Sequence, residues 1–321
     1  MIVKLHEKEQ EVLRLQALDR RVSMTLPTKV YVNKAYRNKI AEVKGEREVA
    51  YSLGFLNGKR FLILHNLRLS DEYGYFQIDT LILNERYIKI LEVKNWYGTL
   101  LFDGNGQVIR IGDNQKEEGF PNPVTQAKMQ KYRLQKWLNN QGFPIPPIDF
   151  FVVISFPSTI IKSLSPSKKT PEKVIYNNQL FFKIQELDEI YTSRVTKMEQ
   201  LKRFSSYLIE AHTPPSDKIL EKYNISKEEL IKGVICSNCS TTPMIRKRGI
   251  WFCGNCNHTS SIAHLAALND YKLLIGHKIT NRDAREFLKI ESPHVVKRLL
   301  QNAGYVVVGE RKWRSYELEI K

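Results

Sequence analysis

The amino-acid sequence predicts an α/β protein in which helices flank a mixed β-sheet, followed by a small cysteine-bearing module and a helical module with a β-wing. Three observations predict this class. Short apolar runs alternate with helical patterns up to residue 156. All four cysteines lie within residues 236–256. Two capped helical patterns and a hairpin pattern occupy residues 280–320. A chain of 321 residues can form two or three domains.

The chain is strongly basic, with 50 Lys and Arg against 34 Asp and Glu, a net charge of +16 and a pI near 9.5. Such a balance predicts a polyanionic partner, and nucleic acid is favoured over an acidic membrane. No segment approaches the ~20 apolar residues of a membrane span. The first residues are too polar for a signal peptide, so we expect a cytoplasmic protein that does not engage a membrane. A homo-oligomer is left open.

The first helical patterns cover residues 6–20 and 34–53. Residues 1–35 are therefore interpreted as a helical extension. Strand patterns follow at 60–67, 77–83 and 87–93, and a fourth at 98–102 is expected to complete the sheet. The second and third runs flank the polar break Asn84–Arg86, which indicates a β-hairpin. The four-glycine segment 103–119 is predicted to be a loop near bound substrate.

A further helix is predicted to begin at Asn122-Pro123. The apolar run Ile148–Phe156 is expected to be the last strand of this core, with a Ser, Pro and Lys-rich loop after it at 157–173. An apolar segment at 174–182 and a helix at 186–211 would close the domain. Two prolines at 214 and 215 indicate a boundary, and residues 212–233 are interpreted as a linker and connector.

The hairpin carries three charged residues in an apolar setting, Asp79, Glu92 and Lys94. Residues two apart in a strand share a face, so Glu92 and Lys94 point the same way, and antiparallel pairing can bring Asp79 near them. Two carboxylates beside an ammonium can hold Mg²⁺ or Mn²⁺ and support phosphodiester hydrolysis. The alternative is a surface ion pair with Asp79 capping a turn, but the flanking apolar runs argue against exposure.

Asp79 followed by Glu92-Val93-Lys94 matches the D…(D/E)xK pattern. Together with the segments GEREVAYSL, HNLRL, QIDTLIL, ILEVKNWYG and NPVTQ, it resembles the nuclease-related domain (NERD) branch of the restriction-endonuclease-like PD-(D/E)xK superfamily. The resemblance covers about residues 36–150, within a predicted nuclease domain at 36–211. Ile78 stands where many relatives have proline, a position without a chemical role.

This resemblance implies a restriction-endonuclease-like fold and a metal-dependent nuclease that leaves 5′-phosphate and 3′-hydroxyl ends. It also implies that Glu46, preceded by Gly45, assists as a ligand of the metal or water, and that Gln126 faces the active site. His65 lies at a strand end, where a histidine is more often structural than catalytic.

The four cysteines form two CxxC pairs separated by 13 residues, Cys236 and Cys239 followed by Cys253 and Cys256. Four thiolates in two such pairs bind Zn²⁺ tetrahedrally, and the intervening MIRKRGIWF can form the hairpin of a zinc ribbon. We therefore predict a structural Zn²⁺ in a ribbon at residues 234–262. A disulfide or a redox pair would not account for the symmetric spacing.

Residues 263–321 resemble a winged helix-turn-helix module. Thr280 and Ser292 are predicted N-caps of two helices, and a hairpin about Gly309–Lys312 would form the wing. Residues 236–321 hold 14 Lys and Arg against 7 Asp and Glu. The predicted nucleic-acid-binding residues share a basic side chain and a place on the second helix or the wing: His294, Lys297, Arg298, Arg311, Lys312 and Arg314.

The sequence thus predicts a Mg²⁺-dependent DNA endonuclease that a zinc ribbon and a winged helix tether to DNA. Two alternatives remain. One is a DNA-binding or regulatory protein that keeps the nuclease fold without turnover, although the complete Asp, Glu and Lys set argues against it. The other is an RNA-directed nuclease, because a basic surface and a zinc ribbon also suit RNA.

Overall fold

The computed structural model describes residues 1–102, 106–112, 115–142, 146–164, 170–310 and 313–320. The chain forms two compact units. The first unit comprises Met1–Glu9 and Lys39–Pro215, and the second comprises Gln10–Asn38 and Ser216–Lys321. Each unit is described by itself.

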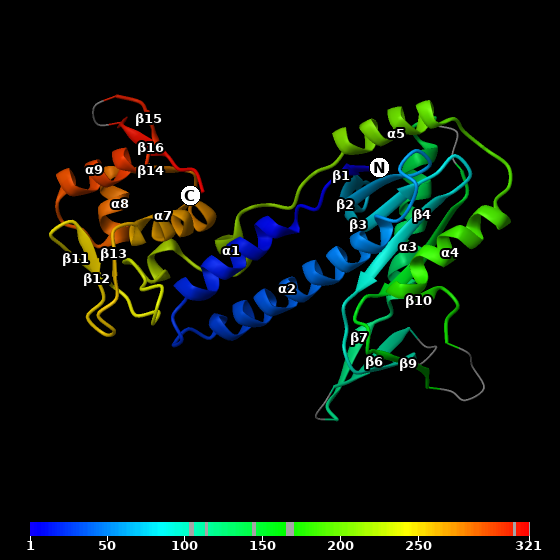
Figure 1. The fold of residues 1–321 in the computed structure, drawn as a ribbon, viewed down its shortest axis with the longest axis horizontal. Coiled ribbons are helices and arrows are strands. Elements are labelled where there is room, and N and C mark those ends of the chain that lie inside the picture. Colours follow the sequence, from blue (N-terminus) through cyan, green and yellow to red (C-terminus); the bar gives the residue numbers. More distant parts are fainter. Residues whose placement is uncertain (103–105, 113–114, 143–145, 165–169, 311–312, 321) are drawn as a thin grey trace. The chain divides into compact units, whose positions relative to one another are not determined.

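The first unit is built on a six-stranded sheet (Figure 1). Its strands, in spatial order, are β1 (Ile2–Lys4), β2 (Leu62–Asp71), β3 (Gly74–Leu83), β4 (Ile88–Lys94), β8 (Ile148–Ile154) and β10 (Val174–Tyr176). β3 is antiparallel to β2 and β4, whereas β1–β2, β4–β8 and β8–β10 are parallel pairs. The mixed sheet confirms the predicted fold class, and β3 with β4 confirms the predicted hairpin.

Helices cover both faces of this sheet, which gives three layers. α3 (Pro123–Asn139) and α5 (Met198–Glu210) bury their apolar residues against one face, around Leu64, Ile90 and Val152. α2 (Thr28–Leu53) and α4 (Asn177–Ile190) contribute to the core on the other face. Because β4 is buried on both faces, its sequence is nearly continuous in apolar residues. The middle of β3, where Asp79 lies, and the end of β4, which carries Glu92 and Lys94, therefore lie between two helical layers.

A smaller four-stranded sheet follows the hairpin. Its strands, in spatial order, are β7 (Glu117–Pro121), β6 (Gln107–Ile111), β5 (Thr99–Phe102) and β9 (Ile160–Ser163). The sequence-based expectation that 98–102 completes the main sheet is therefore wrong, because β5 pairs with β6 and β9 instead. The predicted loops at 103–119 and 157–173 contain strands of this sheet.

Three further expectations need correction. α2 begins at Thr28 rather than at residue 34, directly after Pro27, a residue suited to the start of a helix. β8 is not the last strand, because β10 adds to the same edge. The predicted helix 186–211 is two helices, α4 and α5. Between them, the N–H groups of Val195 and Thr196 bond to the carbonyl oxygen of Glu85, a pairing incompatible with a continuous helix.

The second unit contains α1 (Lys8–Arg21) from Gln10 onward and the first part of α2. Their apolar residues pack with those of α6 (Ile219–Lys222) and of the segment around a 3₁₀ turn at Lys227–Glu229. The cysteine module forms a three-stranded antiparallel sheet of β11 (Ile245–Lys247), β12 (Ile250–Phe252) and β13 (Thr259–Ser260). The predicted hairpin at MIRKRGIWF is confirmed.

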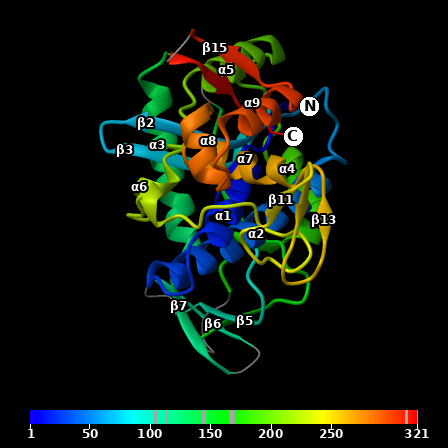
Figure 2. The ribbon, with the colours of Figure 1, turned by 90° about the vertical axis from the view of Figure 1, so that its left-hand side faces the viewer.

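The C-terminal part, seen in Figure 2, combines three helices with a three-stranded sheet. The elements in chain order are α7 (Ala263–Leu274), β14 (Lys278–Thr280), α8 (Asn281–Leu288), α9 (Pro293–Asn302), β15 (Val306–Val308) and β16 (Ser315–Glu317). Both predicted caps form, because Thr280 accepts from the Asp283 N–H at 3.1 Å and Ser292 from the Val295 N–H at 3.4 Å. Among the described residues, no helix combines the length and the apolar composition needed to cross a bilayer.

Candidate functional site

Asp79 lies where the ladder between β2 and β3 is interrupted. The pairs Leu64–Leu81 and Leu67–Ile78 keep one register, yet all four residues belong to the same core. Residues three apart in a regular strand point to opposite faces, so the alternation between the two faces of the sheet must shift by one residue in each strand between these pairs. In β2 the shift coincides with Asn66, whose φ is +51°. Such irregularities re-aim side chains, and here the Asp79 carboxylate accepts a 3.1 Å hydrogen bond from the Val93 N–H of β4.

Glu92 and Lys94 leave β4 toward α3. Lys94 Nζ donates to Glu92 Oε1 at 2.6 Å and to Gln126 Oε1 at 3.2 Å. The other Glu92 oxygen accepts from Gln130 Nε2 at 2.6 Å. Glu92 is only 1% exposed. Each Glu92 carboxylate oxygen therefore accepts a hydrogen bond from a side chain, one from Lys94 and the other from Gln130.

Glu46 comes from α2, which approaches the sheet closely one residue earlier. A Cβ at Gly45 would lie 2.5 Å from Ser155 Oγ and 2.6 Å from Asn95 Cβ, so only glycine permits this approach. Glu46 is buried, and its Oε2 accepts from Asn66 Nδ2 at 2.8 Å. The Gly-Glu pair therefore brings a buried carboxylate to the irregular part of β2.

Lys8 connects the carboxylates of Glu42 and Glu46 on α2 with that of Asp79 on β3. Its ammonium bonds to Glu42 at 2.6 Å, to Asp79 at 3.1 Å and to Glu46. Carboxylate oxygens of Glu42, Glu46 and Asp79 all lie within 4.8 Å of one another. Oxygen donors at this spacing fit a hard divalent cation.

The charges of these groups are strongly coupled. Burial, and next the negative charge of Asp79, raise the pKa of Glu92 to about 7. Burial alone would raise the pKa of Asp79, but the positive charges of Lys8 and Lys94 lower it. Although burial opposes its charge, Lys94 has a raised pKa because Glu92 and Asp79 attract the proton. Near neutral pH the site therefore holds a charged Lys94, an ionised Asp79 and a Glu92 close to its titration midpoint.

His65 is fully buried and stacks on His6 with ring centroids 3.8 Å apart. Burial, followed by the charges of His6 and Lys4, lowers its pKa to about 3. The ring is neutral near pH 7, and its Nδ1 lies 3.0 Å from the Thr80 hydroxyl. These contacts agree with a structural histidine.

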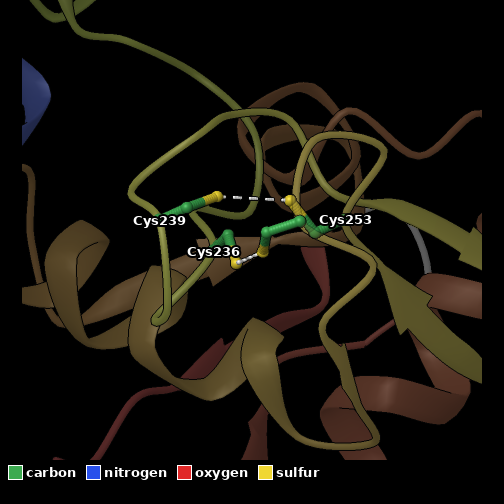
Figure 3. Close-up of side chains that lie close together, drawn as sticks. Cys236, Cys239 and Cys253 are labelled. Carbon is green, nitrogen blue, oxygen red and sulfur yellow. Dashed lines mark hydrogen bonds between the residues drawn. The ribbon is translucent and has the colours of Figure 1, made fainter.

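The four cysteines converge in the second unit, as Figure 3 illustrates. The Cys239 and Cys253 sulfurs are 3.5 Å apart, the Cys236 and Cys256 sulfurs are 3.6 Å apart, and all four lie within 4.8 Å of one another. Hydrogen bonding with Thr241 is the main cause that lowers the pKa of Cys239 to about 5. Four thiol groups in this arrangement can bind zinc.

The predicted nucleic-acid-binding residues His294, Lys297 and Arg298 lie on α9, and each is exposed. Arg314, after the hairpin turn, is also exposed. Arg311 and Lys312 lie outside the described residues. Within the part of the chain that the structure describes, neither Lys297 nor Arg298 forms a salt bridge. Their charges are available to a polyanion.

Sequence reasoning missed three residues of the charged network. Gln130 follows Gln126 by four positions, so helical periodicity could have placed both on one face of α3. Glu42 precedes Glu46 by the same interval on α2. Lys8 is 71 residues from Asp79, and no local pattern signals that contact.

Comparison with known proteins finds a family match within the first unit. Residues 41–155 match the family model of the nuclease-related domain. The chain is also 25% identical over 182 residues to an uncharacterized protein from Bacillus anthracis, an alignment that covers 56% of this chain and 80% of that relative. No solved structure matches the chain significantly.

Proposed function

We propose that the first unit, in which residues 41–155 match the nuclease-related domain, is a Mg²⁺- or Mn²⁺-dependent endonuclease acting on DNA. The observation that carries the proposal is that two charged networks meet between the middle of β3 and the C-terminal end of β4. One joins Glu92, Lys94 and Gln126, and the other joins Asp79 and Glu46 through Lys8. Asp79 couples them, because its charge acts on both Glu92 and Lys94.

Asp79 and Glu46, whose carboxylate oxygens lie within 4.8 Å of each other, would hold the divalent cation, with Glu92 of the neighbouring strand as a further ligand. The bound cation would polarise a phosphoryl oxygen and make a water more acidic. Lys94 keeps its positive charge at neutral pH and would offset negative charge that develops on the phosphate. Gln126 orients that ammonium through its 3.2 Å contact.

The second unit would hold the enzyme on its substrate. In this proposal, residues 234–262 are a zinc ribbon with a structural Zn²⁺ on the four cysteines, and residues 263–321 are a winged helix. The order α7, β14, α8, α9, β15, β16 supports the winged-helix assignment. Exposed basic residues on α9 would contact phosphates, so that tethering raises the local concentration of DNA at the nuclease site.

Plasmid nicking tests the enzymatic proposal. Supercoiled plasmid is incubated with the full chain, with and without Mg²⁺, and the wild type is compared with Asp79→Asn. We expect metal-dependent conversion to nicked or linear DNA, which Asp79→Asn reduces at least a hundredfold. Asp149→Asn is the matched control, because Asp149 lies in the same sheet and its side chain is 15% exposed against 13% for Asp79.

Persistent cleavage by Asp79→Asn, or none by the wild type with Mg²⁺ or Mn²⁺, would contradict the proposal. Retained duplex binding by an inactive wild type would instead favour a DNA-binding protein. Parallel reactions on single-stranded DNA and on RNA separate a DNA-directed enzyme from an RNA-directed one.

A further inference from the structure

We infer that Lys8 is an internal cation of the active site, which competes with the divalent metal for Asp79 and Glu46 and thereby sets the metal affinity. The inference rests on the proposed metal site. It assigns a role to a residue outside the matched nuclease-related segment, which begins at residue 41.

Carboxylates occupy all the donors of the Lys8 ammonium. An ammonium has three donors, and Lys8 has three carboxylate partners, Glu42 at 2.6 Å, Asp79 at 3.1 Å and Glu46. Its side chain is only 7% exposed. A positive centre surrounded by three carboxylates, and largely removed from water, has the surroundings of a bound cation.

The carboxylate oxygens of Asp79 and Glu46 that do not contact Lys8 have hydrogen-bond donors of their own. The other Asp79 oxygen accepts from the Val93 N–H, and the other Glu46 oxygen accepts from Asn66. The remaining oxygen of each carboxylate is the one that accepts from Lys8. A divalent ion bound by both would stand within a few ångströms of the ammonium, where like charges repel strongly. Metal binding therefore requires that Lys8 withdraw.

The fold holds Lys8 in place through the segment that precedes it. The preceding strand β1 pairs in parallel with β2 at Ile2–Ile63 and Lys4–Leu64. Between β1 and Lys8, His6 stacks on the buried His65. Lys8 is thus delivered by an anchored segment rather than by a free chain end, and its competition with the metal is a built-in property of the site.

Metal binding by Lys8→Met tests this inference without recourse to cleavage. Mn²⁺ affinity is measured by titration calorimetry and electron paramagnetic resonance on the full, zinc-loaded chain. We expect Lys8→Met to bind Mn²⁺ about tenfold more tightly or better, because the competing charge is gone. Lys89→Met is the matched control. Lys89 is a fully buried lysine of β4 that pairs with Asp149 at 2.7 Å, and its loss should leave Mn²⁺ affinity unchanged.

A measurement on the wild type covers the case in which Lys8→Met does not fold. Saturating Mg²⁺ should increase acetylation of the Lys8 amine by acetic anhydride several-fold, read by peptide mass spectrometry, while Lys89 stays unchanged. Unchanged or weaker Mn²⁺ affinity in folded Lys8→Met, or acetylation that Mg²⁺ does not alter, would overturn the inference, since Lys8 would then merely hold the carboxylates in place. Absence of Mn²⁺ binding in both proteins would overturn the proposed metal site as well.

Discussion

Gln130 Nε2 donates a 2.6 Å hydrogen bond to Glu92 Oε2 and a 2.9 Å bond to the carbonyl oxygen of Gln77. One turn earlier on α3, Gln126 contacts Lys94. Four residues of helix rise about 6 Å, and two residues of strand span about 6.8 Å. Because these intervals nearly match, two glutamines on α3 can each hold one charged residue of β4.

Gln130→Leu should disturb Glu92 specifically. The substitution removes a donor that favours the ionised carboxylate, so the pKa of Glu92 should rise further above about 7. The acidic limb of the pH–rate profile should then move to higher pH. Stability at pH 8 should fall by about 1–3 kcal/mol, since Gln77 also loses its bond. Gln135→Leu on the same helix, where the amide contacts only Asn139 in the described structure, should shift neither quantity.

Ionisation of Glu92 should weaken the fold. Its pKa is 4.5 in an unfolded chain and about 7 here, so between these values the folded protein binds more protons than the unfolded one. Stability therefore falls as pH rises from 4.5 through 7, by about 3 kcal/mol in total.

Glu92→Gln should accordingly be more stable than the wild type at pH 8 without added Mg²⁺, and the difference should vanish near pH 4.5. Denaturant unfolding across this range measures it, with the exposed Glu117→Gln as a control that follows the wild-type curve. A pH-independent difference would mean that packing, and not ionisation, separates the two proteins.

Gly45→Ala should displace Glu46. The added methyl would meet Ser155 and Asn95 at about 2.5 Å, and relieving that overlap must shift α2, at a cost of about 1–3 kcal/mol. Thermal unfolding should show the loss, and Mn²⁺ affinity should fall with it. Gly119→Ala adds a methyl whose nearest contact is Gln107 Oε1 at 3.9 Å, and it should change neither. Normal metal binding by Gly45→Ala would show that Glu46 does not depend on this close approach.

The parts of the fold that local sequence determines were predictable. Apolar runs around Asn84–Arg86 predicted the hairpin, and Thr280 and Ser292 marked helix starts through caps that the structure contains. The second sheet was not predictable, because Thr99 pairs with Ile111 and Ile160 and such distant partners leave no periodic signal. The same limit applies to the site. Residues two or four apart could be grouped, whereas Lys8 reaches its partners only through the tertiary fold.

Arg298→Ala should weaken binding to duplex DNA mainly through electrostatics. Each phosphate contact that is lost should reduce the slope of log affinity against log salt by about 1 in magnitude. Fluorescence anisotropy over a salt series measures that slope. Lys222→Ala serves as the control, because Lys222 is already paired with Glu11 at 3.1 Å and should contribute little. Equal slopes for wild type and Arg298→Ala would place the phosphate contacts elsewhere on the protein.

Zinc removal should loosen the second unit beyond the cysteine module itself. Cys236 and Cys253 are each 1% exposed and share one hydrophobic core with Leu268 of α7, Leu288 of α8 and Leu300 of α9. Without metal, four thiolates at this spacing repel or protonate, and the core they border loses its support. A zinc chelator should therefore increase amide hydrogen exchange throughout α7–α9. The exchange rates of β3 and β4 in the first unit should stay as they were.

Added Zn²⁺ should restore slow exchange in α7–α9, whereas added Mg²⁺ should not, because thiolates select the softer ion. Exchange that stays slow in α7–α9 after complete zinc removal would mean that the helices sustain this core alone. Duplex binding measured on the same samples should fall and recover together with α9 protection, since α9 presents Lys297 and Arg298.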